Sequence, residues 1–307
     1  MSTSGVEEVE ESLPARLTPY ELAFPASRFE TGVFAEILDE AESRGARTGT
    51  PAEFLMLGLV GSALREQMPG PGEDEGGESS PDPGAGQVLD EYGRLFFQAY
   101  HFWRFGKRLI VPDTQLVRKL VDDMPTVGDW MLTPPYPAGY LQLPRHLFWV
   151  ALAPGSPPEP VDGIFWTMIG EDDPAEPPYR RLDLVAVAGM RAGRPGFSTI
   201  GVAADLVGTK PGHWADADAR PDGRDFASVL PGGDIDRLYS LTTTLEVLKL
   251  VSLAFWYMAT HREAVRQVEP PAPDTLRPPG PHELPPSALP YERVGLIPED
   301  DAGATAG

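Results

Sequence analysis

Histidine has the widest chemistry of any residue in this chain, because its imidazole binds metals and transfers protons near neutral pH. The five histidines are His101, His146, His213, His261 and His282. Their spacing forms neither HExxH nor a pair separated by three residues, the patterns that place two zinc ligands on one helix face. A zinc site would therefore need distant segments, so we expect no metal and ordinary surface or core histidines.

Four aspartates form the other arrangement that could bind a cation: Asp216, Asp218, Asp222 and Asp225. Their order resembles the start of a twelve-residue calcium loop. However, Arg220 stands at the fifth position of that loop and Ala227 at the last, where calcium loops carry oxygen ligands. We interpret this segment as a solvated acidic loop.

Motifs of the other catalytic classes are absent from the sequence. The chain has no cysteine, which excludes disulfides, cysteine-bound zinc, iron–sulfur clusters and thiol catalysis. It also has no GxSxG, GxGxxG or Walker-type phosphate-binding motif. We therefore predict no catalytic, cofactor-binding or metal-binding residue. Two alternatives stay open: a hydrolase-like enzyme whose site combines His146, His213 and residues 216–225, and a structural subunit of a larger assembly.

The strongest functional pattern is a basic, aromatic segment between residues 94 and 119. Its bases are Arg94, Arg104, Lys107, Arg108, Arg118 and Lys119, against Asp113 alone. Such a segment suits an acidic protein partner or single-stranded nucleic acid. The net charge of −21 repels phosphate backbones and therefore favours the protein partner. The alternative is internal, because residues 66–91 hold eight acids and no base and could pair with this segment.

The candidate partner-binding surface has two parts. Trp103, Arg104, Lys107 and Arg108 form the first, and Arg104 and Arg108 share one face if the helix there continues through Gly106. The second part consists of tryptophans in or near strand-like runs, namely Trp130, Trp149 and Trp166. Their simplest role is packing within a sheet, but an exposed aromatic row would be an interaction surface.

The elements that must position these residues begin with helices. Ser27 and Glu30 form a capping box before a helix with apolar residues at Phe34, Ile37 and Ala41. Further helices are expected over residues 50–67, over residues 88–105, and from about residue 112 to a position before residue 125.

From residue 138 the pattern changes to short runs rich in β-branched and aromatic residues. These runs cover residues 138–143, 147–152, 163–169, 182–189 and 198–204. Their short, non-helical connections favour antiparallel pairing. Apolar residues at helical spacing from Leu238 to Ala259 predict a long C-terminal helix. The predicted fold class is α+β: N-terminal helices, a central antiparallel sheet of about four to five strands, and the long helix packed on it.

Composition sets the expected boundaries. Residues 1–18 are acidic, lack the apolar region of a signal peptide, and are expected to be disordered. A single domain covers residues 19–267, with residues 66–91 as a flexible acidic loop. Residues 268–307 are expected to be a proline-rich disordered tail. The longest apolar run has ten residues, too few to span a bilayer, so we expect a soluble, cytoplasmic protein; its oligomeric state is not predicted.

The order of several motifs resembles a known family. The motifs are Phe102–Arg104, the segment 109–125, the aromatic run 130–144, Gly163–Trp166 and the apolar segment 250–258. Together they resemble a family of phage and bacterial proteins that includes the second type V-A anti-CRISPR protein. The resemblance covers residues 92–259 and implies a shared fold and a regulatory protein that acts by contact, without a catalytic motif. That inhibitor ends in a basic region, whereas this chain ends in an acidic, proline-rich one, so RNA recognition is not carried over.

Overall fold

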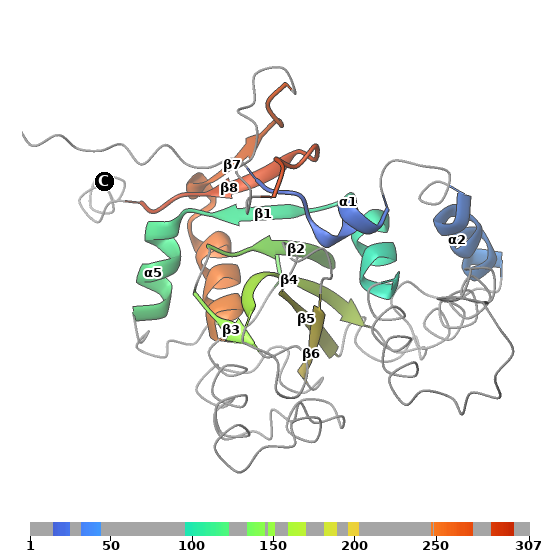
Figure 1. Ribbon diagram of the computed structural model, residues 1–307, viewed down its shortest axis with the longest axis horizontal. Helices are drawn as coiled ribbons and strands as arrows, with labels where there is room; N and C mark the ends of the chain where they lie inside the picture. Colours follow the sequence, from blue (N-terminus) through green and yellow to red (C-terminus); the bar gives the residue numbers. More distant parts are fainter. Residues whose placement is uncertain are drawn as a thin grey trace, which may run out of the picture.

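The computed structural model describes the parts of the chain that form a mixed β-sheet and the helices beside it (Figure 1). The described residues are 15–24, 32–43, 96–122, 134–144, 147–150, 159–169, 181–188, 196–202, 247, 249–272 and 284–297. The sheet has eight strands in the order β6-β5-β4-β2-β1-β8-β7, with β3 paired to β4 outside this path. The fold class is α+β, as the sequence predicts.

Parallel strands form the centre of one half of the sheet. β1 (Leu109–Pro112) pairs in parallel with both β2 (Ala138–Gln142) and β8 (Tyr291–Val294). α5 (Thr114–Asp122) lies between β1 and β2 in the sequence and supplies the crossover that parallel neighbours need. β7 (Val265–Val268) pairs antiparallel with β8 at the end of the strand order. We call β2, β1, β8 and β7 the parallel half.

The other half of the sheet is antiparallel throughout. β4 (Glu159–Ile169) pairs with β2 and with β5 (Arg181–Ala188), and β5 pairs with β6 (Gly196–Val202). The short β3 (Trp149–Val150) pairs with the start of β4. The described side chains of β5 are all buried, as expected for a strand covered on both faces. We call β3, β4, β5 and β6 the antiparallel half.

One face of the sheet is covered by N-terminal elements. α1 (Pro19–Ala23) begins with a capping box: Thr18 Oγ1 accepts from the Glu21 amide at 3.3 Å, and the Glu21 carboxylate accepts from the Thr18 amide at 2.9 Å. α2 (Phe34–Ser43) and the helical residues 96–104 join it in an aromatic cluster with the sheet. The strand residues in this cluster include Leu109, Tyr140 and Phe165.

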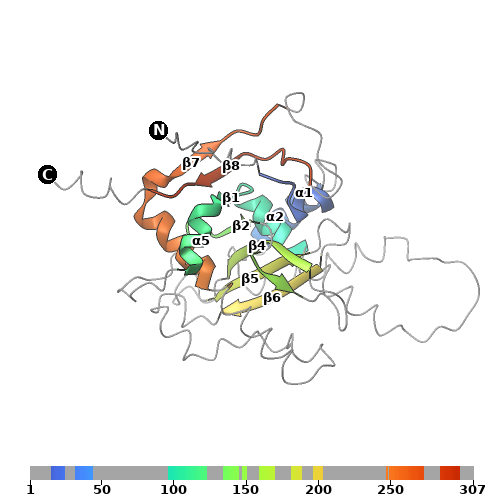
Figure 2. The same ribbon diagram turned by 60° about the vertical axis from the view of Figure 1, so that its left-hand side comes forward.

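The opposite face is covered by α5 and by helical residues 249–260. In Figure 1 these two helices lie on one side of the sheet and α1 and α2 on the other, and Figure 2 again shows α5 and residues 249–260 side by side. Alternate strand residues point to this second core, among them Ile110, Leu141 and Ile164. Trp166 meets Phe255 here, with ring centroids 5.1 Å apart. A single turn, η5 (Arg262–Ala264), connects this side to β7.

The sheet corrects the predicted architecture. It is mixed and larger than an antiparallel sheet of about four to five strands, because β1, β7 and β8 join it. These strands have four residues each, too few to show a clear alternation in the sequence. A long C-terminal helix is not shown: the described helical residues there are 247 and 249–260.

The chain ends also differ from expectation. β8 lies in the middle of the parallel half, so residues 284–297 are not part of a disordered tail. They pair with the start of the chain: the Leu17 amide donates to the Pro285 carbonyl at 2.9 Å, and the Ser287 amide donates to the Ala15 carbonyl at 2.8 Å. The predicted boundary between a disordered N-terminus and the domain, at residue 18, is therefore too late, because Ala15 and Leu17 already pair with the C-terminal segment. The capping box at Ser27, the helix over 50–67 and the acidic loop 66–91 lie outside the described residues.

Candidate functional site

A helix end shapes the basic segment. Helical residues 96–104 end in a Schellman motif: the Lys107 amide donates to the Phe102 carbonyl at 2.7 Å and the Gly106 amide to the Trp103 carbonyl at 3.1 Å. Gly106 has φ 83°, the left-handed conformation that glycine adopts easily. Because the helix stops before Gly106, Arg104 and Arg108 do not share a helix face.

Lys107 continues the left-handed turn with φ 54°, the one positive φ among the described non-glycine residues. A side chain in this region is uncommon, and such strain persists where the surrounding contacts hold it. The turn carries the chain from the helix directly into β1. Arg104, Lys107 and Arg108 lie around this turn, at the end of the sheet where the interior strand β1 begins, a place that we call the basic corner.

Each of these three cations lies over a tyrosine ring. The distances to the ring centroids are 5.9 Å for Arg104 Cζ and Tyr100, 5.3 Å for Lys107 Nζ and Tyr20, and 4.5 Å for Arg108 Cζ and Tyr136. All three cations are half-buried. A cation over an aromatic face gains about 0.5–1 kcal/mol at an exposed site, so each side chain is held in place.

The tyrosines divide the three cations between the two faces of the sheet. Tyr20 and Tyr100 belong to the cluster under α1 and α2, whereas Tyr136 packs against the cluster under α5. Arg104 and Lys107 therefore lie on one side of the corner and Arg108 on the other. Trp103 is half-buried in the first cluster, where it contacts Phe34 with ring centroids 5.5 Å apart.

Arg108 lies in a polar cluster that the sequence does not reveal. Glu292 is 6% exposed and lies in β8 opposite Ile110 of β1. Its Oε1 accepts a hydrogen bond from the Tyr136 hydroxyl at 2.5 Å and lies 3.7 Å from Arg108 Nη1. Burial, and then the bond to Glu292, raise the pKa of Tyr136 to about 12. The phenol therefore stays protonated and keeps donating at physiological pH.

Two atoms of this cluster are buried without a hydrogen-bond partner: Arg108 Nε and Glu292 Oε2. The Arg108 side chain as a whole nevertheless remains 42% exposed. Nearby, Gly139 gives room for Trp166, because a Cβ there would lie 2.3 Å from the indole ring. The cluster combines a half-buried cation with a buried carboxylate and an aromatic support.

The tryptophans predicted as contact residues have different positions. Trp166 is fully buried, and its indole Nε1 donates to the Tyr136 carbonyl at 2.9 Å, so it is a core residue. Trp149 in β3 is 37% exposed, whereas its neighbour Phe148 is buried, as strand alternation predicts. Trp130 lies outside the described residues.

The histidines form no shared site within the described residues, which also contain no group of three or more potential metal ligands. His101 is fully buried, and neither ring nitrogen has a hydrogen-bond partner. Burial, with a smaller effect of Arg104, lowers its pKa to about 3. His261 stacks on Tyr257 with ring centroids 4.4 Å apart. His146, His213, His282 and the acidic loop 216–225 lie outside the described residues.

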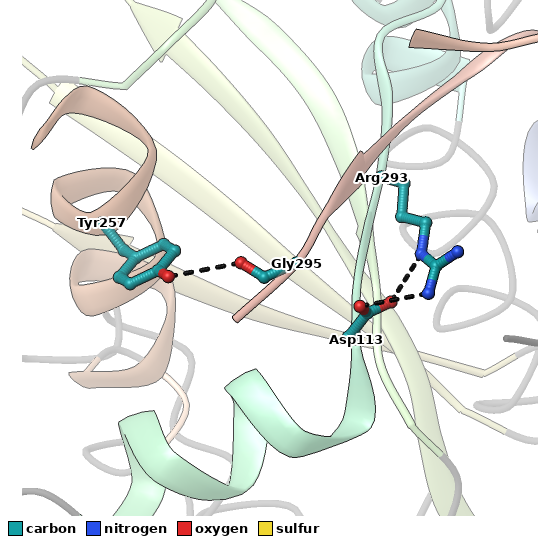
Figure 3. Close-up of polar contacts among 4 residues, drawn as sticks. All are labelled: Asp113, Tyr257, Arg293 and Gly295. Carbon is teal, nitrogen blue, oxygen red and sulfur yellow. Dashed lines mark hydrogen bonds and ion pairs between the residues drawn. The ribbon is translucent and has the colours of Figure 1, made fainter. Parts of the chain in front are cut away.

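A second ion pair lies at the other end of the parallel strands. Arg293 of β8 donates to both carboxylate oxygens of Asp113, with Nε–Oδ1 at 2.7 Å and Nη2–Oδ2 at 3.2 Å (Figure 3). Beside it, the Tyr257 hydroxyl donates to the Gly295 carbonyl at 3.2 Å (Figure 3). The hydrogen bond from Arg293 to Asp113 raises the pKa of the guanidinium. These contacts fasten β8 to β1 and to the helix of residues 249–260.

Sequence reasoning missed Tyr136 and Glu292, which stand 156 positions apart. Neither belongs to a motif, and Glu292 lies in a segment whose prolines suggest a tail. The left-handed turn did have a signal, because Gly106 directly follows the last helical residues, where glycine usually ends a helix. None of the described helices is both long and apolar enough to cross a membrane.

Comparison with known proteins adds no relative. No protein-family model matches this chain. No curated protein matches it closely enough to count as similar.

Proposed function

We propose that this chain is a non-enzymatic binding protein that regulates a protein partner by contact, through the basic corner formed by Arg104, Lys107 and Arg108. The observation that carries the proposal is the support of three neighbouring cations by three tyrosine rings. Holding a long side chain in advance lowers the ordering cost of binding, which is about 0.5–1.5 kcal/mol for each immobilised side chain. The corner is therefore suited to recognition.

The partner surface should be acidic. Cations concentrated at one corner of a chain with net charge −21 attract an acidic patch locally, whereas a nucleic acid brings many phosphates into a repulsive field. At physiological salt, charges separated by more than about 8 Å are largely screened. A compact acidic patch on a protein thus feels the corner more than it feels the rest of the chain. The sequence resemblance to a family of inhibitory proteins favours a regulatory role over a structural one.

The test is a pull-down with the tagged full-length protein from a lysate of the organism that encodes it, with and without nuclease. The variant is Arg104→Glu with Lys107→Glu. Arg108 is left unchanged, because its contacts with Tyr136 and Glu292 make its reversal a risk to folding. The proposal expects a protein that wild type retains with or without nuclease and that the double variant loses.

The matched control is Arg118→Glu with Arg266→Glu, which reverses the same charge at two exposed positions away from the corner. It should retain the partner. Equal loss in both double variants would mean that overall charge, not the corner, governs binding. Loss after nuclease treatment would instead indicate a nucleic-acid partner.

A further inference from the structure

Arg108 differs from the other two cations in how it is held. Its Cζ lies 4.5 Å from the centroid of the Tyr136 ring and its Nε is buried, so a ligand must approach through the Nη1 and Nη2 donors. Among the described residues, the ion-paired carboxylate oxygen lies 3.7 Å from Nη1, beyond hydrogen-bond distance. That oxygen already accepts from the Tyr136 hydroxyl. The guanidinium is therefore positioned by its neighbours, yet they do not saturate its donors.

We propose that Arg108 recognises a single carboxylate, an Asp or Glu side chain of the partner, and that Tyr136 and Glu292 are its positioning residues. This inference rests on the proposed function and names the chemical group that the basic corner binds. A guanidinium edge matches a carboxylate because two parallel N–H donors meet two oxygens. Lysine cannot reproduce that geometry, since its ammonium is a point charge.

Glu292 favours this assignment. The Glu292 carboxylate lies 3.7 Å from Arg108 Nη1 and attracts the guanidinium, which helps to hold the side chain over Tyr136. Because Glu292 is itself buried, it presents almost no negative surface to an approaching ligand. Its charge still offsets part of the charge of Arg108, so the exposed part of the guanidinium binds an anion mainly through its hydrogen-bond donors.

The first measurement is fluorescence anisotropy of the full-length protein with two labelled peptides, octaglutamate and octaglutamine. We expect binding of octaglutamate only. Arg108→Lys, which keeps the charge, should weaken it by about tenfold or more, because charge-assisted hydrogen bonds are lost. Arg118→Lys, the matched change at an exposed position of α5, should leave affinity within about twofold. Tyr136→Ala should weaken binding and Tyr136→Phe should retain it, since the ring supports the guanidinium.

The second measurement needs no substitution. Phenylglyoxal modifies accessible arginines, and mass spectrometry follows Arg108 and Arg118 in the same sample. Octaglutamate should slow modification of Arg108 and leave Arg118 unaffected. Equal reactivity with and without the peptide, or unchanged affinity in Arg108→Lys, would overturn the assignment.

Two further outcomes separate this inference from the function on which it rests. If Arg104→Glu with Lys107→Glu abolishes capture of the partner while Arg108→Lys changes neither capture nor peptide affinity, the proposed function stands and the Arg108 assignment fails. If amide replacement of Glu73, Asp74, Glu75 and Glu78 speeds modification of Arg108 without any peptide, the carboxylate comes from the chain itself. That result would overturn recognition of a partner carboxylate.

Discussion

The two halves of the sheet are assembled in different ways. The antiparallel half uses strands between residues 149 and 202, and apart from β4's pairing with β2 each strand pairs with a sequence neighbour. The parallel half brings β1 and β2 together with β7 and β8, which follow more than a hundred residues later. Closing a chain over such a distance costs conformational entropy before any contact compensates for it. The parallel half therefore depends on long-range contacts, and the antiparallel half on local ones.

The candidate site belongs to the long-range half. Arg108 directly precedes β1, Tyr136 precedes β2, and Glu292 lies in β8. The three residues meet only when all three strands have paired. Disturbing the parallel half should thus remove the site, whereas disturbing the antiparallel half should first affect stability.

The largest expected effect comes from removing β8. Ending the chain after residue 283 deletes Tyr291 and Val294 from the two cores and leaves β1 and β7 without their shared neighbour. Domains of this size are stable by only about 5–15 kcal/mol, so we expect no cooperative unfolding transition. Thermal unfolding followed by near-ultraviolet circular dichroism measures this.

The matched control ends the chain after Ile297, which keeps β8 and its contacts. This shorter deletion should shift the melting temperature little. A cooperative transition in the chain that ends after residue 283 would mean that the antiparallel half folds without β8. The two halves would then be independent folding units.

The second prediction concerns the seam between the halves, where β2 pairs with β4. A Cβ at Gly139 would lie 2.3 Å from the buried Trp166 ring and 2.9 Å from the Arg108 carbonyl. Gly139→Ala should therefore destabilise the protein by about 3 kcal/mol through overpacking. Gly32→Ala is the control, because a Cβ there meets nothing within 4 Å. Urea unfolding compares them, and equal midpoints would show that the seam can relax.

The sequence predicts the antiparallel half better than the parallel half, and strand length explains the difference. β4 and β5 have eleven and eight residues, enough to show a pattern, and their predicted runs overlap the observed strands. β8 has four residues, Tyr-Glu-Arg-Val, of which two are charged. Glu292 is buried there only because Tyr136 and Arg108 come to it from distant segments. The periodicity of a single sequence does not predict contacts between distant segments.

The candidate site shows the same limit. The cations could be found because they cluster in the sequence, and the turn could be found from Gly106. The tyrosines that support the cations could not be found in the same way. Tyr20, Tyr100 and Tyr136 come from three separate segments, and the periodicity of the sequence does not predict how these segments pack together. Trp166 had two possible roles, packing within the sheet or exposure on a surface, and its full burial agrees with the first.

The third prediction tests whether the two halves unfold together. His101 lies in the helix that packs on β4, where Phe102 contacts Phe165 and Gln98 accepts from Thr167 Oγ1 at 2.7 Å. Its folded pKa of about 3 lies below the ordinary 6.5, so on acidification the unfolded chain takes up a proton that the folded chain refuses. Stability should fall as the pH drops below 6.5, by about 2 kcal/mol between pH 7 and pH 5.

His101→Leu removes the titrating group at similar size, so the wild-type loss between pH 7 and pH 5 should shrink by that amount in urea titrations. If tyrosine and tryptophan signals from both halves shift with pH together, the protein unfolds as one unit. A pH dependence unchanged in His101→Leu would assign the effect to other groups.

The smallest expected effect concerns the ion pair that joins β8 to β1. Asp113 and Arg293 are partly exposed, with side chains 26% and 39% accessible, so water and salt weaken their attraction. A double-mutant cycle with Asp113→Ala and Arg293→Ala should give a coupling of about 0.5–1 kcal/mol that decreases in high salt. A coupling that salt does not change would point to the two-point hydrogen bonding as the stabilising contact. A coupling near zero would mean that β8 is held to β1 by the strand ladder and its buried side chains, and the long-range half would then owe its stability to burial, as the local half does.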